Sequence, residues 1–220
     1  MAVAQRMYEK LYLEASEPVL WDVDAVGVSA TGLATIELTK GNVAELAPVL
    51  LRHVALTRHP AVAEELLLRL GARRVPGLPN IAVPHLAMFI RKIPEDYLGS
   101  VSTPEERTQW KERVEMLAGS VLGEFVSPDW ADVFFDLASD GALGSGRFNI
   151  ILNLHRTNRD DVGDFLLALI ADEAVRNFVI EALGKMRYAP ALAKISEHQD
   201  SVDPQVRKVV RAAVRRLDEQ

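Results

Sequence analysis

Residues 175–186 read VRNFVIEALGKM and residues 206–217 read VRKVVRAAVRRL, and these two stretches decide the fold. They lie 31 positions apart (206 minus 175), and their apolar residues recur with the spacing of one face of a helix. A helix with a single apolar face needs a neighbour to cover it, so copies of such a unit stack and share a core. The sequence therefore predicts an all-α chain in which antiparallel helix pairs stack into an α-solenoid.

The repeat extends toward the N-terminus. Arg147 lies 29 positions before Arg176 (176 minus 147), and the apolar residues that follow the two arginines match. The predicted first helix of each pair repeats as well, at Leu137, Leu166 and Ile195. We therefore expect three consecutive repeats over residues 129–220.

Residues 42–128 predict more divergent helix pairs. The helical period is clear over residues 42–54 and 61–70, and a proline-rich stretch then predicts a loop followed by a helix over residues 84–93. A hydroxyl cap, a proline and two acidic residues form a strong helix start at Thr103 to Glu106. That helix is expected to run to about residue 125.

Residues 1–41 predict a helix followed by a cap. The helix covers residues 3–13, and Pro18 is expected to end it. Residues 19–40 are rich in glycine and β-branched residues, which fits either a β-hairpin or an irregular segment with short strands. We favour the irregular segment, because the end of a stack needs an atypical cap over its apolar face. The whole chain is then a single domain.

The composition excludes several classes of protein. A formal net charge of −6 argues against a protein that coats nucleic acid. The absence of cysteine excludes disulfides, thiolate nucleophiles and cysteine-ligated metal sites. No apolar stretch reaches the length of a signal peptide core or a membrane span. The sequence predicts a cytoplasmic protein with no membrane segment.

Residues 175–186, and the Asp203-Pro204-Gln205-Val206-Arg207 start of the last helix, resemble the short bacterial HEAT-like repeats. The second helix of that family reads roughly Asp-Pro-x-Val-Arg-x-x-Ala-x-x-Ala-Leu-Gly. The resemblance implies a curved stack with the second helices on its concave side. It also implies that the aspartate and the arginine of this motif pair between adjacent repeats, which gives a structural role to the three arginines Arg147, Arg176 and Arg207.

Two groups of residues are candidates for binding a protein. Asparagines in the apolar register of one repeat indicate a helix face that is turned to a groove, because a buried asparagine needs hydrogen-bond partners. The resulting polar patch comprises Asn149, Asn153, Arg156, Glu181 and Lys185. On the last helix, Arg211 and Arg215 continue a basic ridge from Arg207, which fits an acidic partner or simply the polar outer face of a terminal repeat.

Three aspartates form an acidic stripe along one side of a predicted helix, at Asp129, Asp132 and Asp136. Their mutual repulsion predicts a nearby cation, either on a basic partner or on a neighbouring helix. They do not form a calcium loop, and the five histidines lack zinc-binding spacing, so we predict no metal site. No nucleophile elbow or phosphate-binding loop occurs, and no cofactor is expected.

These observations favour a non-enzymatic scaffold that binds another protein on its concave face, as an adaptor, assembly factor or inhibitor. The alternative is an enzyme resembling the HEAT-like alkylpurine DNA glycosylases, for which Trp110, Asp129 and Trp130 offer aromatic and acidic side chains. The net charge and the acidic stripe argue against nucleic acid as the partner. Phycobilin-lyase-like proteins share the repeat, but no residue here singles out a pigment site.

Overall fold

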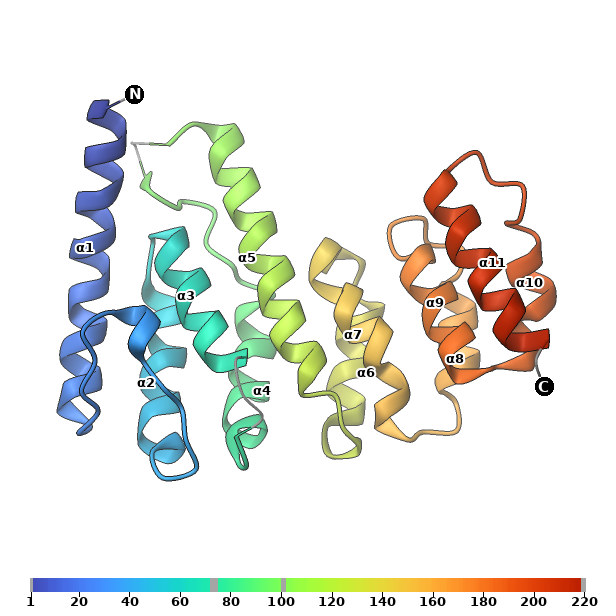
Figure 1. The fold of residues 1–220 in the computed structure, drawn as a ribbon, viewed down its shortest axis with the longest axis horizontal. Coiled ribbons are helices and arrows are strands. Elements are labelled where there is room, and N and C mark those ends of the chain that lie inside the picture. The colour runs from blue at the N-terminus through green and yellow to red at the C-terminus, as the bar shows by residue number, and fades with distance from the viewer. Residues whose placement is uncertain (1, 72–74, 100–101, 219–220) are drawn as a thin grey trace. The chain divides into compact units, whose positions relative to one another are not determined.

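The computed structural model describes residues 2–71, 75–99 and 102–218, with side chains from residue 5 onward. Within these residues the protein is all-α, with eleven α-helices, several short 3-10 turns and no β-strand (Figure 1). This confirms the predicted class. The chain forms two compact units, Met1–Val121 and Leu122–Gln220, and each has its own apolar core. Among the described helices, none is long and apolar enough to cross a membrane.

Unit 1 contains four complete helices and most of a fifth. The capping box at the start of the long fifth helix is present, because Thr103 N–H donates to Glu106 Oε2 at 2.7 Å and Glu106 N–H donates to Thr103 Oγ1 at 3.2 Å. The elements are α1 Ala2–Ala25, η1 Leu33–Thr35, α2 Val43–Leu56, α3 Pro60–Gly71, α4 Leu78–Phe89 and α5 Pro104–Glu124.

The first helix is longer than the sequence predicts. It runs through Pro18 to Ala25, so the expectation that Pro18 ends it is wrong. Proline removes one backbone donor and strains the preceding turn. Val19 and Val23, which follow the proline, are fully buried, and α1 packs against α2 and α3. Burial of these valines offsets the cost of the proline.

No strand forms between residues 19 and 40, so the β-hairpin alternative is wrong. After α1 ends, the chain is irregular apart from the short turn η1, which packs against α1 and α3. Leu33, Ile36 and Leu38 are buried in this segment, although it has no regular structure. Their burial explains why a glycine-rich stretch is held in place.

The fourth helix also differs from its predicted position. It begins at Leu78 and ends at Phe89, whereas the prolines had suggested a start at Pro84 and an end at residue 93. Pro79 occupies the first turn, where a missing N–H costs nothing, and Pro84 is tolerated inside the helix. The helix therefore starts six positions earlier than predicted, because neither proline prevents it from forming.

Unit 2 contains three helix pairs at the predicted positions. Within the pairs α6 contacts α7, α8 contacts α9, and α10 contacts α11. The second helices are also in contact with one another, α7 with α9 and α9 with α11. The elements are η3 Pro128–Trp130, α6 Ala131–Ser139, η4 Gly141–Arg147, α7 Phe148–Asn153, η5 Leu154–Thr157, α8 Val162–Leu169, α9 Arg176–Met186, η6 Ala189–Ala191, α10 Leu192–Ser196 and α11 Pro204–Asp218.

In the segment before each second helix, an aspartate side chain accepts a hydrogen bond from the backbone N–H two residues later. Asp140 Oδ1 accepts from Ala142 N–H at 3.0 Å, Asp172 Oδ1 from Ala174 N–H at 3.0 Å, and Asp203 Oδ1 from Gln205 N–H at 2.7 Å. Each carboxylate satisfies a backbone donor, and Asp203, which directly precedes α11, also lies at the positive end of that helix's dipole. The repeat is therefore visible in the hydrogen bonds as well as in the sequence.

An arginine at the start of each second helix donates to backbone carbonyls of the preceding segment. Arg176 Nε bonds Ile170 O at 3.1 Å, and Arg207 Nη1 bonds Ser201 O and Val202 O at 2.5 and 3.0 Å. Arg147, only 2% exposed, donates to Ala138 O and pairs with the Asp172 carboxylate of the next repeat at 2.6 Å. These contacts give the three arginines a structural role.

Candidate functional site

The second helices of unit 2 expose a pair of stacked aromatic rings. Phe148 on α7 and Phe178 on α9 have ring centroids 4.2 Å apart and an interplanar angle of 16°, and both side chains are half-buried. An offset stack of this kind holds both rings in place and leaves part of their faces accessible to a partner. The sequence did not indicate this pair, although its members are 30 positions apart (178 minus 148).

Two of the predicted polar residues lie on α7 and bond to one another. Asn153 Nδ2 donates to the backbone oxygen of Asn149 at 2.9 Å, one helical turn earlier. The end of α5 approaches α7 closely at Gly123, where a Cβ would lie 2.9 Å from the Asn149 backbone. The asparagines are therefore accommodated within unit 2, and both are half-buried.

Arg156 has a structural position. Its guanidinium donates to the backbone oxygens of Gly123 at 3.3 Å and Glu124 at 3.0 Å, the last carbonyls of α5. Carbonyls at a helix C-terminus lack intrahelical partners, and an arginine is well suited to bind them. Arg156 thus stabilises the end of α5.

Glu181 and Lys185 form an ion pair on α9, with Lys185 Nζ 2.7 Å from Glu181 Oε1. Glu181 follows Phe178 by three positions and Lys185 follows it by seven, so the pair and the aromatic ring share one face of the helix. Both side chains are partly exposed, so either one can form an ion pair with a charged group of a binding partner instead.

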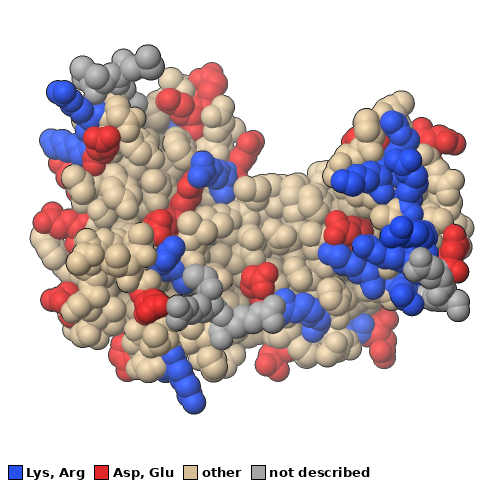
Figure 2. Space-filling view, viewed as in Figure 1, with Lys and Arg blue, Asp and Glu red and all other residues tan. Residues whose placement is uncertain are grey.

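Arg211 and Arg215 lie on α11 and are exposed. They alternate with the buried residues Val206, Val210, Ala213 and Leu217, so they point to the side of the helix opposite the core. Figure 2 shows Lys and Arg side chains gathered over this part of unit 2. We call this group the basic surface; its exposed members are Lys185, Arg187, Lys208, Arg211 and Arg215.

An arginine of unit 2 forms an ion pair with one aspartate of the acidic stripe. Arg159, in the segment before α8, pairs with Asp132 Oδ1 and with Asp161 Oδ2 at 2.6 Å each. Its guanidinium also lies 4.3 Å from the ring centroid of Phe135, a cation–π contact. The prediction of a nearby cation is therefore confirmed for Asp132, and that cation comes from the neighbouring repeat. Asp129 is exposed in η3.

Unit 1 holds a buried histidine that the sequence did not mark as special. His59 is 2% exposed, and among the described residues neither ring nitrogen has a hydrogen-bond partner. The edges of Tyr8 and Tyr12 on α1 contact it, at centroid distances of 4.6 and 5.6 Å. Burial lowers the pKa of His59, and the backbone of Tyr8 offsets this only in part. The imidazole is therefore held in its neutral form.

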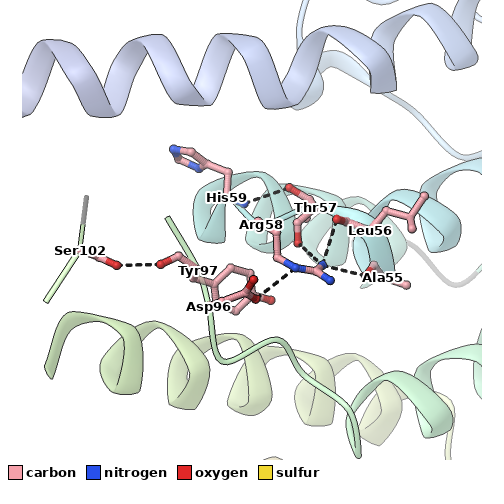
Figure 3. Close-up of polar contacts among 8 residues, drawn as sticks. All are labelled: Ala55, Leu56, Thr57, Arg58, His59, Asp96, Tyr97 and Ser102. Atoms are coloured by element: carbon pink, nitrogen blue, oxygen red, sulfur yellow. Dashed lines mark hydrogen bonds and ion pairs between the residues drawn. The ribbon is translucent and has the colours of Figure 1, made fainter. Parts of the chain in front are cut away.

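A pocket of about 440 Å³ lies beside this histidine, between α1 and the segments that join α2 to α3 and α4 to α5. Arg58 and Asp96 form an ion pair at its edge, 3.1 Å apart, and the His59 ring points away from them (Figure 3). Arg58 Nη1 also donates to the carbonyls of Ala55, Leu56 and Thr57, which end α2. The Arg58 guanidinium therefore stabilises the end of α2.

The residues that could support DNA base chemistry are divided between the two units. Trp110 lies in unit 1, where it stacks on Tyr8 at 6.3 Å and faces the Arg113 guanidinium at 5.7 Å. Asp129 and Trp130 belong to η3 in unit 2. Across residues 2–71, 75–99 and 102–218, no three His, Asp or Glu side chains are grouped to hold a metal ion.

Comparison of the chain with protein-family models, with curated proteins and with solved structures finds no match.

Proposed function

We propose that this protein is a helical-repeat scaffold, related in architecture to the HEAT-like repeats, and that it binds another protein through the second helices of unit 2. The surface on α7, α9 and α11 would form the concave side of such a stack. The observation that carries the proposal is the half-buried Phe148–Phe178 stack beside the partly exposed Glu181–Lys185 pair. Aromatic side chains bordered by exchangeable charges are typical of protein interfaces.

The repeated hydrogen bonds support the repeat architecture. The aspartate caps and the arginine contacts recur at each of the three second helices, and Arg147 joins one repeat to Asp172 of the next. Such contacts fix the positions of neighbouring helix pairs while leaving the outer residues of the second helices available. Helix-pair scaffolds of this kind present broad binding surfaces and need no catalytic residues.

The charges of this surface define the partner. Five exposed cations of the basic surface lie on or directly after α9 and on α11, although the chain as a whole carries a formal charge of −6. A local excess of positive charge attracts a negatively charged segment and favours its association. The partner is therefore an acidic protein segment whose apolar side chains contact the two phenylalanines.

The test compares capture of binding partners by the wild-type protein and by two variants. One variant carries Glu181→Ala with Lys185→Ala, and the other carries Arg211→Glu with Arg215→Glu. We expect an acidic protein to be captured by the wild type, and its affinity, measured with the purified partner, to fall about tenfold or more in each variant. The charge reversal should have the larger effect at low salt.

The matched control is Lys194→Ala with Glu197→Ala, which removes an exposed ion pair of 2.7 Å from α10. It should leave the affinity unchanged. If the same partner binds all four proteins equally, the second-helix surface is not the binding site. Retention of DNA alone, with a steep dependence on salt, would instead favour the nucleic-acid-binding alternative.

A further inference from the structure

The outer side of α1 in unit 1 carries an exposed stripe that no other helix of the unit covers. Figure 1 shows α1 beside α2 and α3 at one end of this unit. The buried residues Ser16, Val19 and Val23 face those helices. On the opposite side, Leu13 is 66% exposed and Trp21 is 65% exposed. These two large apolar side chains lie eight positions apart on one helix, and both are exposed to solvent. Together they form an uncovered apolar surface.

The stripe has the spacing of a coiled-coil contact. Its members follow one another at alternating steps of four and three along the helix, which is the 3.5-residue repeat that keeps side chains facing a partner helix. Trp21 and Glu14 lie directly beside it, and a groove of about 400 Å³ runs along Leu13, Glu17, Leu20 and Trp21. The stripe consists of Arg6, Lys10, Leu13, Glu17, Leu20 and Asp24.

The charges of the stripe are separated along the helix. Arg6 and Lys10 occupy its N-terminal half, where Lys10 also pairs with Glu14 of the same helix at 3.5 Å, whereas Glu17 and Asp24 occupy its C-terminal half. Pairing with a parallel copy would place like charges opposite one another and is disfavoured. Pairing with an antiparallel copy places each basic end opposite an acidic end, and both ends of the contact are then satisfied.

We propose that α1 is the contact surface of a symmetric homodimer, in which the α1 helices of two copies pair antiparallel. In this arrangement Arg6 lies opposite Asp24 of the second copy, and the Lys10 side chain covers Trp21 of that copy. An isologous two-fold contact requires a surface that is complementary to itself, and the charge separation along α1 provides this. Leu13 and Trp21 supply the apolar contact, and the charges set the direction.

The test measures the dissociation constant of the full chain by sedimentation velocity over a range of protein concentrations. We expect the wild type to dimerise, and Trp21→Ala to raise the dissociation constant about tenfold or more. Met88→Ala is the matched control, because Met88 is 62% exposed on α4 of the same unit. It should leave the dissociation constant unchanged.

Charge reversal then tests the direction of the pairing. One variant carries Arg6→Glu with Lys10→Glu, and the other carries Glu17→Lys with Asp24→Lys. Each variant should be monomeric alone. An equimolar mixture should dimerise, because the new acidic end of one variant then lies opposite the new basic end of the other. The recovery also shows that both variants are folded.

Three outcomes would overturn the proposal. The first is a wild type that stays monomeric at the highest concentration. The second is a dimer that Trp21→Ala does not weaken, which would place the contact elsewhere. The third is a mixture of the two charge-reversed variants that fails to recover, which would exclude antiparallel pairing through this stripe.

Discussion

His59 makes unit 1 sensitive to acid. Its imidazole is buried against Tyr8 and Tyr12, and burial lowers its pKa below the ordinary value of 6.5. The unfolded chain therefore binds a proton more readily than the folded protein does at mildly acidic pH. The stability that the neutral ring contributes is complete above the ordinary pKa and is lost progressively as the pH falls below it.

We expect His59→Gln to reduce this loss, because glutamine is polar and does not titrate in this range. The measurement is the melting temperature of unit 1 at about pH 7.5 and about pH 5.5, where histidine changes its charge. The melting temperature of the wild type should fall further than that of the variant when the pH is lowered. His85→Gln is the control, since His85 is exposed on α4. An equal fall in melting temperature for the wild type and His59→Gln would contradict the role assigned to the buried ring.

The importance of His59 could not be predicted from its own sequence neighbourhood. The His59-Pro60 dipeptide correctly marks the start of α3, and the sequence favoured a cap or a packed side chain for this histidine. The residues that surround its ring come from α1, about 50 positions earlier, and only the tertiary fold brings them together. Arg159 is similar, because its partner Asp132 is 27 positions away.

The contact between α9 and α11 depends on a small residue. A Cβ at Gly184 would lie 2.8 Å from Ala213 Cβ and 2.9 Å from Ala213 Cα, closer than such atoms approach one another. Alanine normally improves an exposed helix by about 1 kcal/mol relative to glycine. Here the clash with the facing backbone outweighs that gain, because α11 must move for the side chain to fit.

We expect Gly184→Ala to destabilise unit 2 by about 1 to 3 kcal/mol, as overpacking of a well-filled contact does. Denaturant unfolding monitored by circular dichroism gives the free energy of unfolding. Gly141→Ala is the matched control, because a Cβ there meets nothing within 4 Å and Gly141 has no left-handed φ. A stabilised Gly184→Ala protein would show that the two helices are not in close contact.

At the level of elements, local sequence signals predicted the helices that begin with caps and end before glycine or polar turns. The predicted ranges 42–54, 61–70 and 104–125 correspond closely to α2, α3 and α5. The errors occurred at internal prolines, in α1 and α4. In both helices the proline costs one hydrogen bond, and burial of flanking apolar residues makes up for it. A local rule cannot weigh a packing gain that comes from distant residues.

The polar patch was predicted as a set of residues but not as a set of contacts. Asn153 donates to the Asn149 backbone oxygen on α7 and Arg156 donates to the backbone of α5, whereas Glu181 and Lys185 pair with each other. The Phe148–Phe178 stack, which we place at the centre of the binding surface, was missed because each phenylalanine alone reads as an ordinary apolar position. Its members are 30 positions apart, one more than the 29-residue spacing of the two repeats, so the alignment of the repeats did not match them.

For the whole molecule, the division into two units predicts that damage to one core stays within it. Arg147 is almost completely buried and pairs with Asp172 across two repeats of unit 2. Asp172→Ala leaves that guanidinium without its carboxylate, and we expect a loss of about 1 to 3 kcal/mol, less than for a fully buried pair because the Asp172 side chain is 34% exposed. The loss should appear as faster hydrogen exchange in α7 to α11.

Hydrogen exchange followed by mass spectrometry measures this region by region. Exchange in α1 to α4 should match the wild type. Lys194→Ala is the control, because it removes an exposed ion pair of unit 2 that contributes little to stability. Acceleration of exchange across both units to the same extent would show that the chain unfolds as a single cooperative body.

The aspartate caps and arginine contacts of unit 2 have a consequence for how such a protein can grow. Asp172 accepts a hydrogen bond from a residue two positions away, and Arg176 donates to a carbonyl six positions away. Most of the hydrogen bonds that position a helix pair therefore lie within its own repeat. A tandem duplication of one helix pair would copy these bonds together with the apolar face they position. Gene duplication can therefore lengthen the unit and add binding surface one helix pair at a time.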